Sequence, residues 1–148
     1  LRDSAYNERY SQLKKAEEYL DTEYLGSIKQ DQFDENKIND KLILKRARHV
    51  ITENARVLEA KKYILNKDIK SFGKLMNESH QSYAKDFEAS TEDVDSIVER
   101  SKISGAEGAR LTGGGFGGFT VSLIHKNNYD EWQKNMHKYY DNKNIFEV

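Results

Sequence analysis

The sequence contains neither cysteine nor proline. The absence of cysteine excludes disulfides, thiolate metal sites and cysteine nucleophiles. Average usage would place about seven prolines in a chain of this length, so their absence favours long helices without breaks. The sequence has no apolar run of about 18 residues, the length from which a membrane-spanning helix is considered, and it does not open with a signal peptide. We therefore expect no membrane partner, and a reducing, cytoplasmic location agrees with the missing cysteine.

Net charge is also scarce, because 24 basic residues face 25 acidic ones and leave a formal charge of −1. A charge this small gives no electrostatic reason to expect nucleic acid as a partner. The 148 residues match the usual size of one domain, and an aromatic content of 11% favours a folded chain. We expect a single domain over residues 1–148. Because the sequence begins with leucine rather than methionine, we also expect a fragment of a longer protein.

The first two thirds of the sequence predict helices, because apolar residues recur every three or four positions. The first helix has one face of apolar and aromatic residues, namely Tyr6, Tyr10, Leu13, Ala16 and Leu20. Asp3 and Ser4 are its candidate N-caps. Residues 27–40 are polar and irregular, and a second, long helix is expected over residues 40–66.

Two more helices are expected before the pattern changes. Asp68 is a candidate N-cap for a third helix over residues 69–83. Ser90 with Asp93 three positions later resembles a capping box, with aspartate in place of the usual glutamate, and predicts the start of a fourth, short helix.

The last third of the sequence predicts strands and one helix. Residues 106–111 and 119–124 are short candidate strands, the second of them rich in β-branched and apolar residues. A last helix capped at residues 127–128 is expected to continue to Tyr140, and residues 145–148 are a candidate terminal strand. Helices followed by antiparallel strands predict an α+β fold, helix-rich with a small antiparallel sheet.

One glycine-rich segment carries most of the chemical information in the sequence. It consists of Thr112, Gly113, Gly114, Gly115, Phe116, Gly117 and Gly118. An ordered glycine gives up roughly 0.5–1 kcal/mol relative to alanine. Such a loss makes sense where the backbone needs a left-handed conformation, or where a ligand or another chain approaches it closely.

Several interpretations of this segment compete. Gly113, Gly115 and Gly118 match the spacing of a dinucleotide-binding loop, but a strand rather than a helix is expected to follow. The segment does not end in the lysine of a P-loop, and the sequence lacks the lysine strand and catalytic loop of protein kinases. The residues alone leave open a flexible hairpin and a loop whose amides contact phosphate.

Residues 105–118 closely resemble the third conserved motif of the GHMP sugar and metabolite kinases, and the form with Phe116 resembles that of the galactokinase branch. The stretches at residues 4–9, 46–50 and 72–80 are similar to galactokinases as well. The resemblance covers most of the chain. It implies the C-terminal domain of a GHMP kinase, an α+β fold of ferredoxin-like type, with the N-terminal catalytic half absent.

The resemblance also implies a function, the ATP-dependent phosphorylation of galactose to galactose 1-phosphate. In the family, the phosphate-binding loop, the Mg²⁺ ligands and the catalytic aspartate belong to the N-terminal half. The chain therefore has no expected catalytic or metal residue, and the fragment alone is expected to be inactive and to bind no cofactor. ATP, Mg²⁺ and galactose are implied for the full-length enzyme, and the N-terminal domain is implied as a partner in cis.

Two elements of this chain correspond to family sites. Residues 112–118 match the motif that supports the phosphate-binding loop near the transferring phosphate. Tyr6 matches a tyrosine that contacts the sugar; taken from the residues alone, Tyr6 would instead pack in the core at the start of the first helix. Phe119 departs from the family, where many members have cysteine, and we expect this change to affect packing more than chemistry.

Two other functions remain open. The first is the same domain of another GHMP kinase with a different substrate, and the second is a catalytically inactive, galactokinase-like regulator of transcription. An isolated C-terminal domain would also expose an apolar surface and is expected to self-associate.

Charged and histidine residues outside the glycine segment give weaker signals. Residues 45–49 form a basic cluster that we interpret as a solvated helix face. Arg110 is a candidate ligand of a phosphate or an acidic partner, with a surface ion pair as the alternative. The four histidines are never four residues apart, so a histidine-pair metal site is not expected, and we expect no catalytic role for Asp86 and Glu88.

Overall fold

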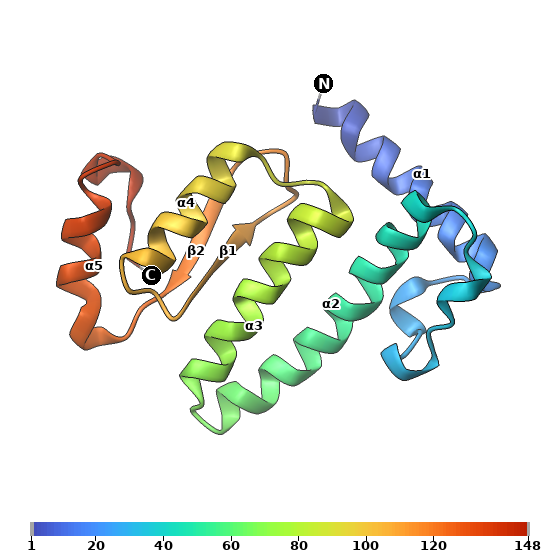
Figure 1. The fold of residues 1–148 in the computed structure, drawn as a ribbon, viewed down its shortest axis with the longest axis horizontal. Helices are drawn as coiled ribbons and strands as arrows, with labels where there is room; N and C mark the ends of the chain where they lie inside the picture. The colour runs from blue at the N-terminus through green and yellow to red at the C-terminus, as the bar shows by residue number, and fades with distance from the viewer. Residues whose placement is uncertain (1, 148) are drawn as a thin grey trace.

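The computed structural model describes residues 2–147 and shows a helix-rich chain with one two-stranded antiparallel sheet (Figure 1), which confirms the α+β prediction. The helices and strands are α1 (Arg2–Leu20), α2 (Lys41–Leu65), α3 (Ile69–Ser82), α4 (Glu92–Ile103), β1 (Gly108–Thr112), β2 (Phe119–Leu123) and α5 (Tyr129–Met136). A π-helical turn, η4 (Tyr83–Phe87), continues α3. None of the helices described between residues 2 and 147 is long and apolar enough to cross a lipid bilayer.

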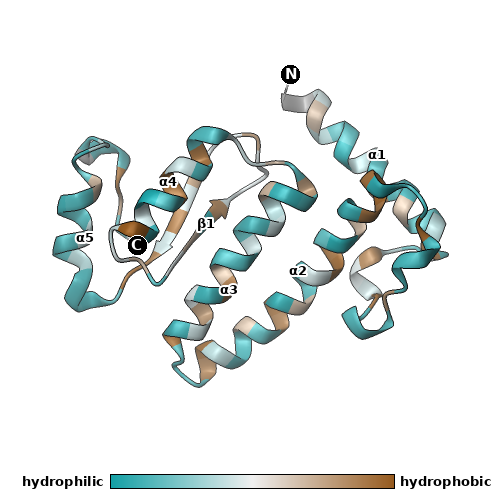
Figure 2. Ribbon diagram, in the orientation of Figure 1, coloured by the Kyte–Doolittle hydropathy of each residue, from teal (hydrophilic) through white to brown (hydrophobic). Residues whose placement is uncertain are grey.

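The core between α1 and α2 is closed by residues 21–40, of which the sequence predicts 27–40 as irregular. This segment forms three short 3₁₀ turns, Leu25–Ser27, Gln30–Gln32 and Glu35–Lys37. Leu25 and Ile38 lie in the buried cluster with Ala16 of α1 and Ala47 of α2. Figure 2 shows apolar residues alternating with hydrophilic ones along the helices, as expected for helices that bury one face each.

The sheet is covered on one face by α4. The hydroxyl of Ser101 in α4 donates to Ser122 of β2 at 2.7 Å, and the indole of Trp132 in α5 donates to Ser101 at 3.0 Å. Side chains alternate between the two faces of a strand, so Phe119 and Val121 point to the opposite face, where both are exposed. The described residues therefore leave the more apolar face of β2 uncovered.

α3 takes the place of a third strand beside β1. The amide of Ala109 donates to Oδ1 of Asn77 at 3.0 Å, and the amide of Leu111 donates to Nδ1 of His80 at 3.3 Å. Gly73 makes this close crossing feasible, because a Cβ there would lie 2.5 Å from the carbonyl oxygen of Glu107. Side chains of α3 thus satisfy the edge of β1 that β2 does not pair.

The predicted cap at Asp68 is confirmed, and the structure adds a second cap at Asp40. Asp40 accepts hydrogen bonds from the amides of Leu42 and Ile43 at the start of α2. Asp68 accepts from the amide of Ser71 at the start of α3. These carboxylates satisfy amides that have no partner within the helix.

Other predicted boundaries are wrong. α4 is capped by Thr91 rather than Ser90, because the hydroxyl of Ser90 bonds Asp95 instead. The prediction that Asp3 and Ser4 cap α1 fails because the helix already includes the residue before them. At the start of the last helical segment, His125 accepts from the amide of Asn127, and no cap by the side chain of Asn128 is present.

The C-terminal end also differs from the prediction. α5 ends at Met136, whereas the sequence pattern continues to Tyr140. Arg100 of α4 stacks on the ring of Tyr139 at 4.3 Å and donates to the hydroxyl of Tyr140 at 3.3 Å, which holds both tyrosines outside the helix. Residues 145–147 form no strand, and position 148 lies outside the described residues.

Candidate functional site

The glycine segment forms the loop between β1 and β2, as the sequence predicts. Its backbone has a left-handed φ at Gly113 (91°), Gly115 (84°), Phe116 (58°), Gly117 (109°) and Gly118 (104°). Residues with a Cβ rarely adopt these angles, so the conformation accounts for four of the five glycines.

One point of the loop is anchored to the rest of the domain. Gly115 is buried, and a Cβ on it would lie 2.6 Å from the carbonyl oxygen of Ala89. The amide of Phe116 donates to that same oxygen at 2.6 Å. The hydroxyl of Tyr83 adds a long hydrogen bond, 3.5 Å, to the carbonyl of Gly113. The loop is therefore docked on the turn after α3 rather than being a flexible hairpin.

Nothing among the described residues explains why position 114 is occupied by glycine. Its φ is not left-handed, and a Cβ built on it would meet nothing within 4 Å. Gly113 and Gly117 have equally open surroundings. Neither conformation nor crowding among the described residues requires glycine at position 114, and the missing side chain leaves its backbone open to close approach from outside the chain.

The turn that holds the loop rests on Arg46, a member of the basic cluster. Arg46 is 1% exposed. Its guanidinium donates to Gln12 and to Glu88, both at 2.7 Å, and to the carbonyl of Asp86. The interpretation of this cluster as a solvated face is therefore wrong at Arg46, because α1 and the turn after α3 cover this part of α2. Sequence periodicity places a residue on a helix face but does not show which faces later become covered.

The carboxylates of the turn are engaged by cations. Arg46 holds the pKa of Glu88 below its usual value, and Lys45 adds an ion pair at 3.3 Å. Arg48 lies 4.0 Å from Asp86 and pairs with Glu35 at 2.7 Å. Within residues 2–147, no three histidine or acidic side chains gather in a group that could hold a metal ion.

His49 lies beneath the same turn. Its ring stacks on Phe87 with centroids 4.8 Å apart and meets the edge of Tyr83 at 5.0 Å. Nδ1 lies 3.0 Å from the hydroxyl of Ser82, which donates to Asp86 at 3.1 Å. Since this hydroxyl gives its proton to Asp86, Nδ1 of His49 is the donor to Ser82. Burial lowers the pKa of His49 from 6.5 to about 4.

This lowered pKa predicts a loss of stability in mild acid. Since the folded state keeps His49 neutral, its contribution is complete above pH 6.5 and is lost as the pH falls toward 4. Between pH 7 and pH 5 the free energy of unfolding should fall by about 2 kcal/mol from this group. Urea unfolding of the wild type and of His49→Gln at both pH values measures the contribution of His49 to the free energy of unfolding. An equal loss in the two proteins would contradict it.

Arg110, just before the loop, has an acidic partner within the chain. Its guanidinium donates to Glu53 at 2.8 Å and to the carbonyl of Leu111 at 3.0 Å. Burial alone would raise the pKa of Glu53, but hydrogen bonds from Ser79 and Arg56 and the charge of Arg110 outweigh burial and lower it. Of the alternatives for Arg110, the ion pair within the chain is the one present, and it is partly buried. It ties β1 to α2 and α3.

Tyr6 lies on the surface rather than in the core. Its side chain is 60% exposed, and Figure 1 shows that the start of α1 projects beyond the other helices. Burial raises the pKa of Tyr83, and the neighbouring phenol of Tyr6 adds to the rise. Core packing of Tyr6 is therefore wrong.

Sequence reasoning missed the residues that hold the loop. Tyr83 and Ala89 lie in a turn that had no predicted role, and Arg9 of α1, which donates to that turn, was not singled out. Arg9 falls within the stretch 4–9 that carries the family resemblance, and this was the available signal.

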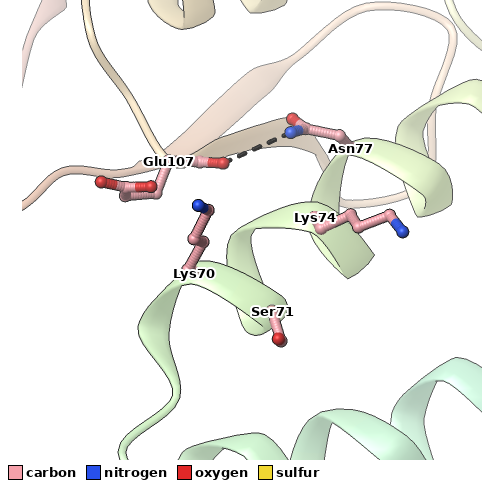
Figure 3. A pocket seen from close by; sticks show the side chains of 5 residues that line it. All are labelled: Lys70, Ser71, Lys74, Asn77 and Glu107. Atoms are coloured by element: carbon pink, nitrogen blue, oxygen red, sulfur yellow. Dashed lines mark hydrogen bonds between the residues drawn. The ribbon is translucent and has the colours of Figure 1, made fainter.

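A pocket of about 350 Å³ lies at the start of α3, away from the loop (Figure 3). It is lined by Lys70, Ser71, Lys74, Asn77 and Glu107. Figure 3 shows the amino group of Lys70 directed toward Glu107 and that of Lys74 directed away. Asn77 uses its amide to bond the carbonyl of Glu107 at 3.3 Å. These side chains do not converge on a common point, and we assign the pocket no role.

Comparison with known proteins adds independent findings. The family described as GHMP kinases C terminal matches residues 60–142. Galactokinase from Lactobacillus helveticus is 40% identical over 147 residues, covering 95% of this chain and 38% of its own length. Galactokinase from Fusobacterium nucleatum subsp. nucleatum is 40% identical over 156 residues, covering all of this chain and 40% of its own length.

A solved structure is similar as well. The structure of Lactococcus lactis galactokinase complexed with galactose aligns with a TM-score of 0.84 and 33% sequence identity. The alignment covers 91% of this chain and 37% of that one. The chain thus spans about two fifths of the length of the relatives it matches. These findings agree with the resemblance carried by the glycine segment.

Proposed function

Since the chain belongs to the GHMP kinases through their C-terminal domain, we propose that it is the C-terminal part of a galactokinase. The complete enzyme would transfer the γ-phosphoryl group of ATP to galactose and release galactose 1-phosphate and ADP. Similarity to galactokinases over nearly the whole chain supports this reaction. The observation that carries the role of this domain is the loop at residues 112–118, docked at Gly115 and open at Gly113, Gly114 and Gly117.

The loop suits a place beside a transferring phosphate. Phosphoryl transfer depends mainly on positioning and on stabilising the charge of the phosphate oxygens. Backbone amides in a glycine-rich turn present donors to an anion without a Cβ in the way. The open surroundings of Gly114 fit the approach of a phosphate or of the loop that binds it. The anchor at Ala89 keeps this surface in one position.

The residues that the structure describes do not fit a Mg²⁺ site. The carboxylates near the loop are Glu53, Asp86 and Glu88, and each bonds or pairs with arginine. Metal ligands and the base that accepts the sugar proton must then come from the remainder of a longer protein. We propose this remainder, the N-terminal domain in cis, as the partner that covers the apolar face of β2 at Phe119 and Val121. The chain alone should be inactive.

Tyr6 is our candidate contact to the sugar. A phenol offers a flat apolar ring and a hydroxyl that donates and accepts hydrogen bonds. The side chain is exposed at the end of α1, so it is accessible to a substrate held between two domains. Tyr10, one turn later on α1, is similarly exposed and provides a matched control.

The experiment measures ADP release by the longer protein with ATP and Mg²⁺ against galactose, glucose, N-acetylgalactosamine, arabinose and mevalonate. We expect turnover with galactose, and none from the 148-residue chain alone. Tyr6→Phe should raise the KM for galactose about tenfold, the effect of losing one hydrogen bond of about 1.4 kcal/mol. Tyr10→Phe should leave KM unchanged. Turnover with another substrate would overturn the sugar, and binding without turnover would favour a regulator.

A further inference from the structure

We propose that Arg9 and Arg46 are positioning residues, which fix the glycine loop by holding in place the three consecutive peptide carbonyls that precede its anchor. The proposal rests on the kinase function proposed above for its effect on turnover. Arg9 lies on α1 and Arg46 on α2, so two separate helices converge on one short turn.

Four consecutive carbonyls, those of residues 86–89, accept hydrogen bonds at this turn. The guanidinium of Arg46 donates to the carbonyl of Asp86. Arg9 donates through Nε to the carbonyl of Phe87 at 2.7 Å and through Nη2 to that of Glu88 at 3.0 Å. The fourth carbonyl, of Ala89, accepts the amide of Phe116 in the loop. Arginine therefore holds the three carbonyls that directly precede the one on which the loop is docked.

The turn needs this support because its backbone is irregular. η4 is a π-helical turn, and the residue after it, Glu88, has a left-handed φ of 54°. A left-handed residue with a Cβ costs about 1 kcal/mol or more and persists only where its surroundings hold it. The carbonyls at the end of a helix have no partner within the helix. The guanidinium groups donate hydrogen bonds to these carbonyls, and the same bonds hold the left-handed backbone at Glu88 in place.

The two arginines act as a connected unit. Oε1 of Gln12 accepts from Nε of Arg46 at 2.7 Å and from Nη1 of Arg9 at 3.4 Å. Arg46 also pairs with the carboxylate of Glu88 at 2.7 Å. The guanidinium of Arg9 lies 5.8 Å from the centre of the Phe116 ring, so Arg9 touches both the turn and the loop.

Lysine cannot replace arginine here. Arg9 reaches two successive carbonyls with two nitrogens of one planar group, and an ammonium is a single point on a flexible stem. Loss of one of these bonds frees the turn to move. Since the Cα of Gly115 packs directly on Ala89, the loop moves with it. A displacement of about 1 Å at a catalytic site can cost on the order of 100-fold in rate.

The test compares Arg9→Lys with the wild type in the longer protein. Amide hydrogen exchange at Phe116 should become about tenfold faster or more, because the bond to Ala89 opens more often. The kcat for galactose should fall about 30-fold, with KM changed less than about twofold. Arg100→Lys, which alters a guanidinium stacked on tyrosines far from the loop, is the matched control and should change neither quantity.

Unchanged exchange at Phe116 in Arg9→Lys would overturn the proposal, and so would an equal change in Arg100→Lys. If Arg9→Lys does not fold, Arg9→Gln, which keeps one donor to the turn, carries the same expectations. A wild type without kinase activity would contradict the proposed function only, because the exchange rate at Phe116 tests the positioning role without a substrate.

Discussion

Replacing Gly115 by valine is expected to lower the rate of phosphoryl transfer about 100-fold in the longer protein. A Cβ at this position would lie 2.6 Å from the carbonyl oxygen of Ala89, and the φ of 84° is unfavourable for a β-branched residue. The loop must then leave its anchor, which displaces its open glycines from the position we propose for them beside the phosphate. Steady-state turnover with galactose at saturating ATP measures the effect.

The control for Gly115→Val is Gly105→Val. Gly105, just after α4, also has a left-handed φ, 110°, but a Cβ there meets nothing within 4 Å. Both variants carry a similar backbone strain, and only one disturbs the docking of the loop. We expect Gly105→Val to lose stability while keeping its kcat. Equal losses of kcat in the two variants would show that strain alone, rather than the anchor at Ala89, causes the effect.

Gly73→Val is expected to destabilise the domain by roughly 4 kcal/mol or more. The Cβ of the new side chain would lie 2.5 Å from the carbonyl oxygen of Glu107. Since this oxygen belongs to the backbone, it cannot move aside as a flexible side chain could. α3 would have to separate from β1, which breaks the bonds from Ala109 to Asn77 and from Leu111 to His80. Urea unfolding followed by circular dichroism measures the change.

Lys74→Val serves as the control for this variant. Lys74 follows Gly73 on the same helix, and its side chain is exposed. It therefore reports only the lower helix propensity of valine, about 0.5 kcal/mol. A loss at Gly73 no larger than that at Lys74 would contradict the close crossing of α3 and β1.

Local patterns in the sequence predicted most of the helices and both strands. The cap at Asp68 bonds an amide only three residues away, so its signal is visible in the sequence. The period of α1 correctly placed Ala16 in the core. It failed at Tyr6 and Tyr10, because the start of α1 extends past the helices that would cover it. Burial depends on neighbours that the local pattern does not contain.

The candidate site was predicted in the same uneven way. The cost of ordering glycine identified the loop and its need for left-handed φ angles. Its anchor was not predictable, because Ala89 and Phe116 are 27 positions apart and the turn that ends at Ala89 has no local signature. Burial of Arg46 likewise depends on Gln12 and Glu88 from two other parts of the chain. Long-range hydrogen bonds of this kind arise only when the helices pack.

The central claim is that the open side of the loop faces the transferring phosphate. The most direct measurement adds Mn²⁺·ATP, as a paramagnetic probe, to the longer protein and records the broadening of amide resonances. We predict strong broadening at Gly113, Gly114 and Gly117, and little at α5 on the far side of the sheet. Sharp loop resonances in a protein that binds Mn²⁺·ATP and phosphorylates galactose would contradict the account.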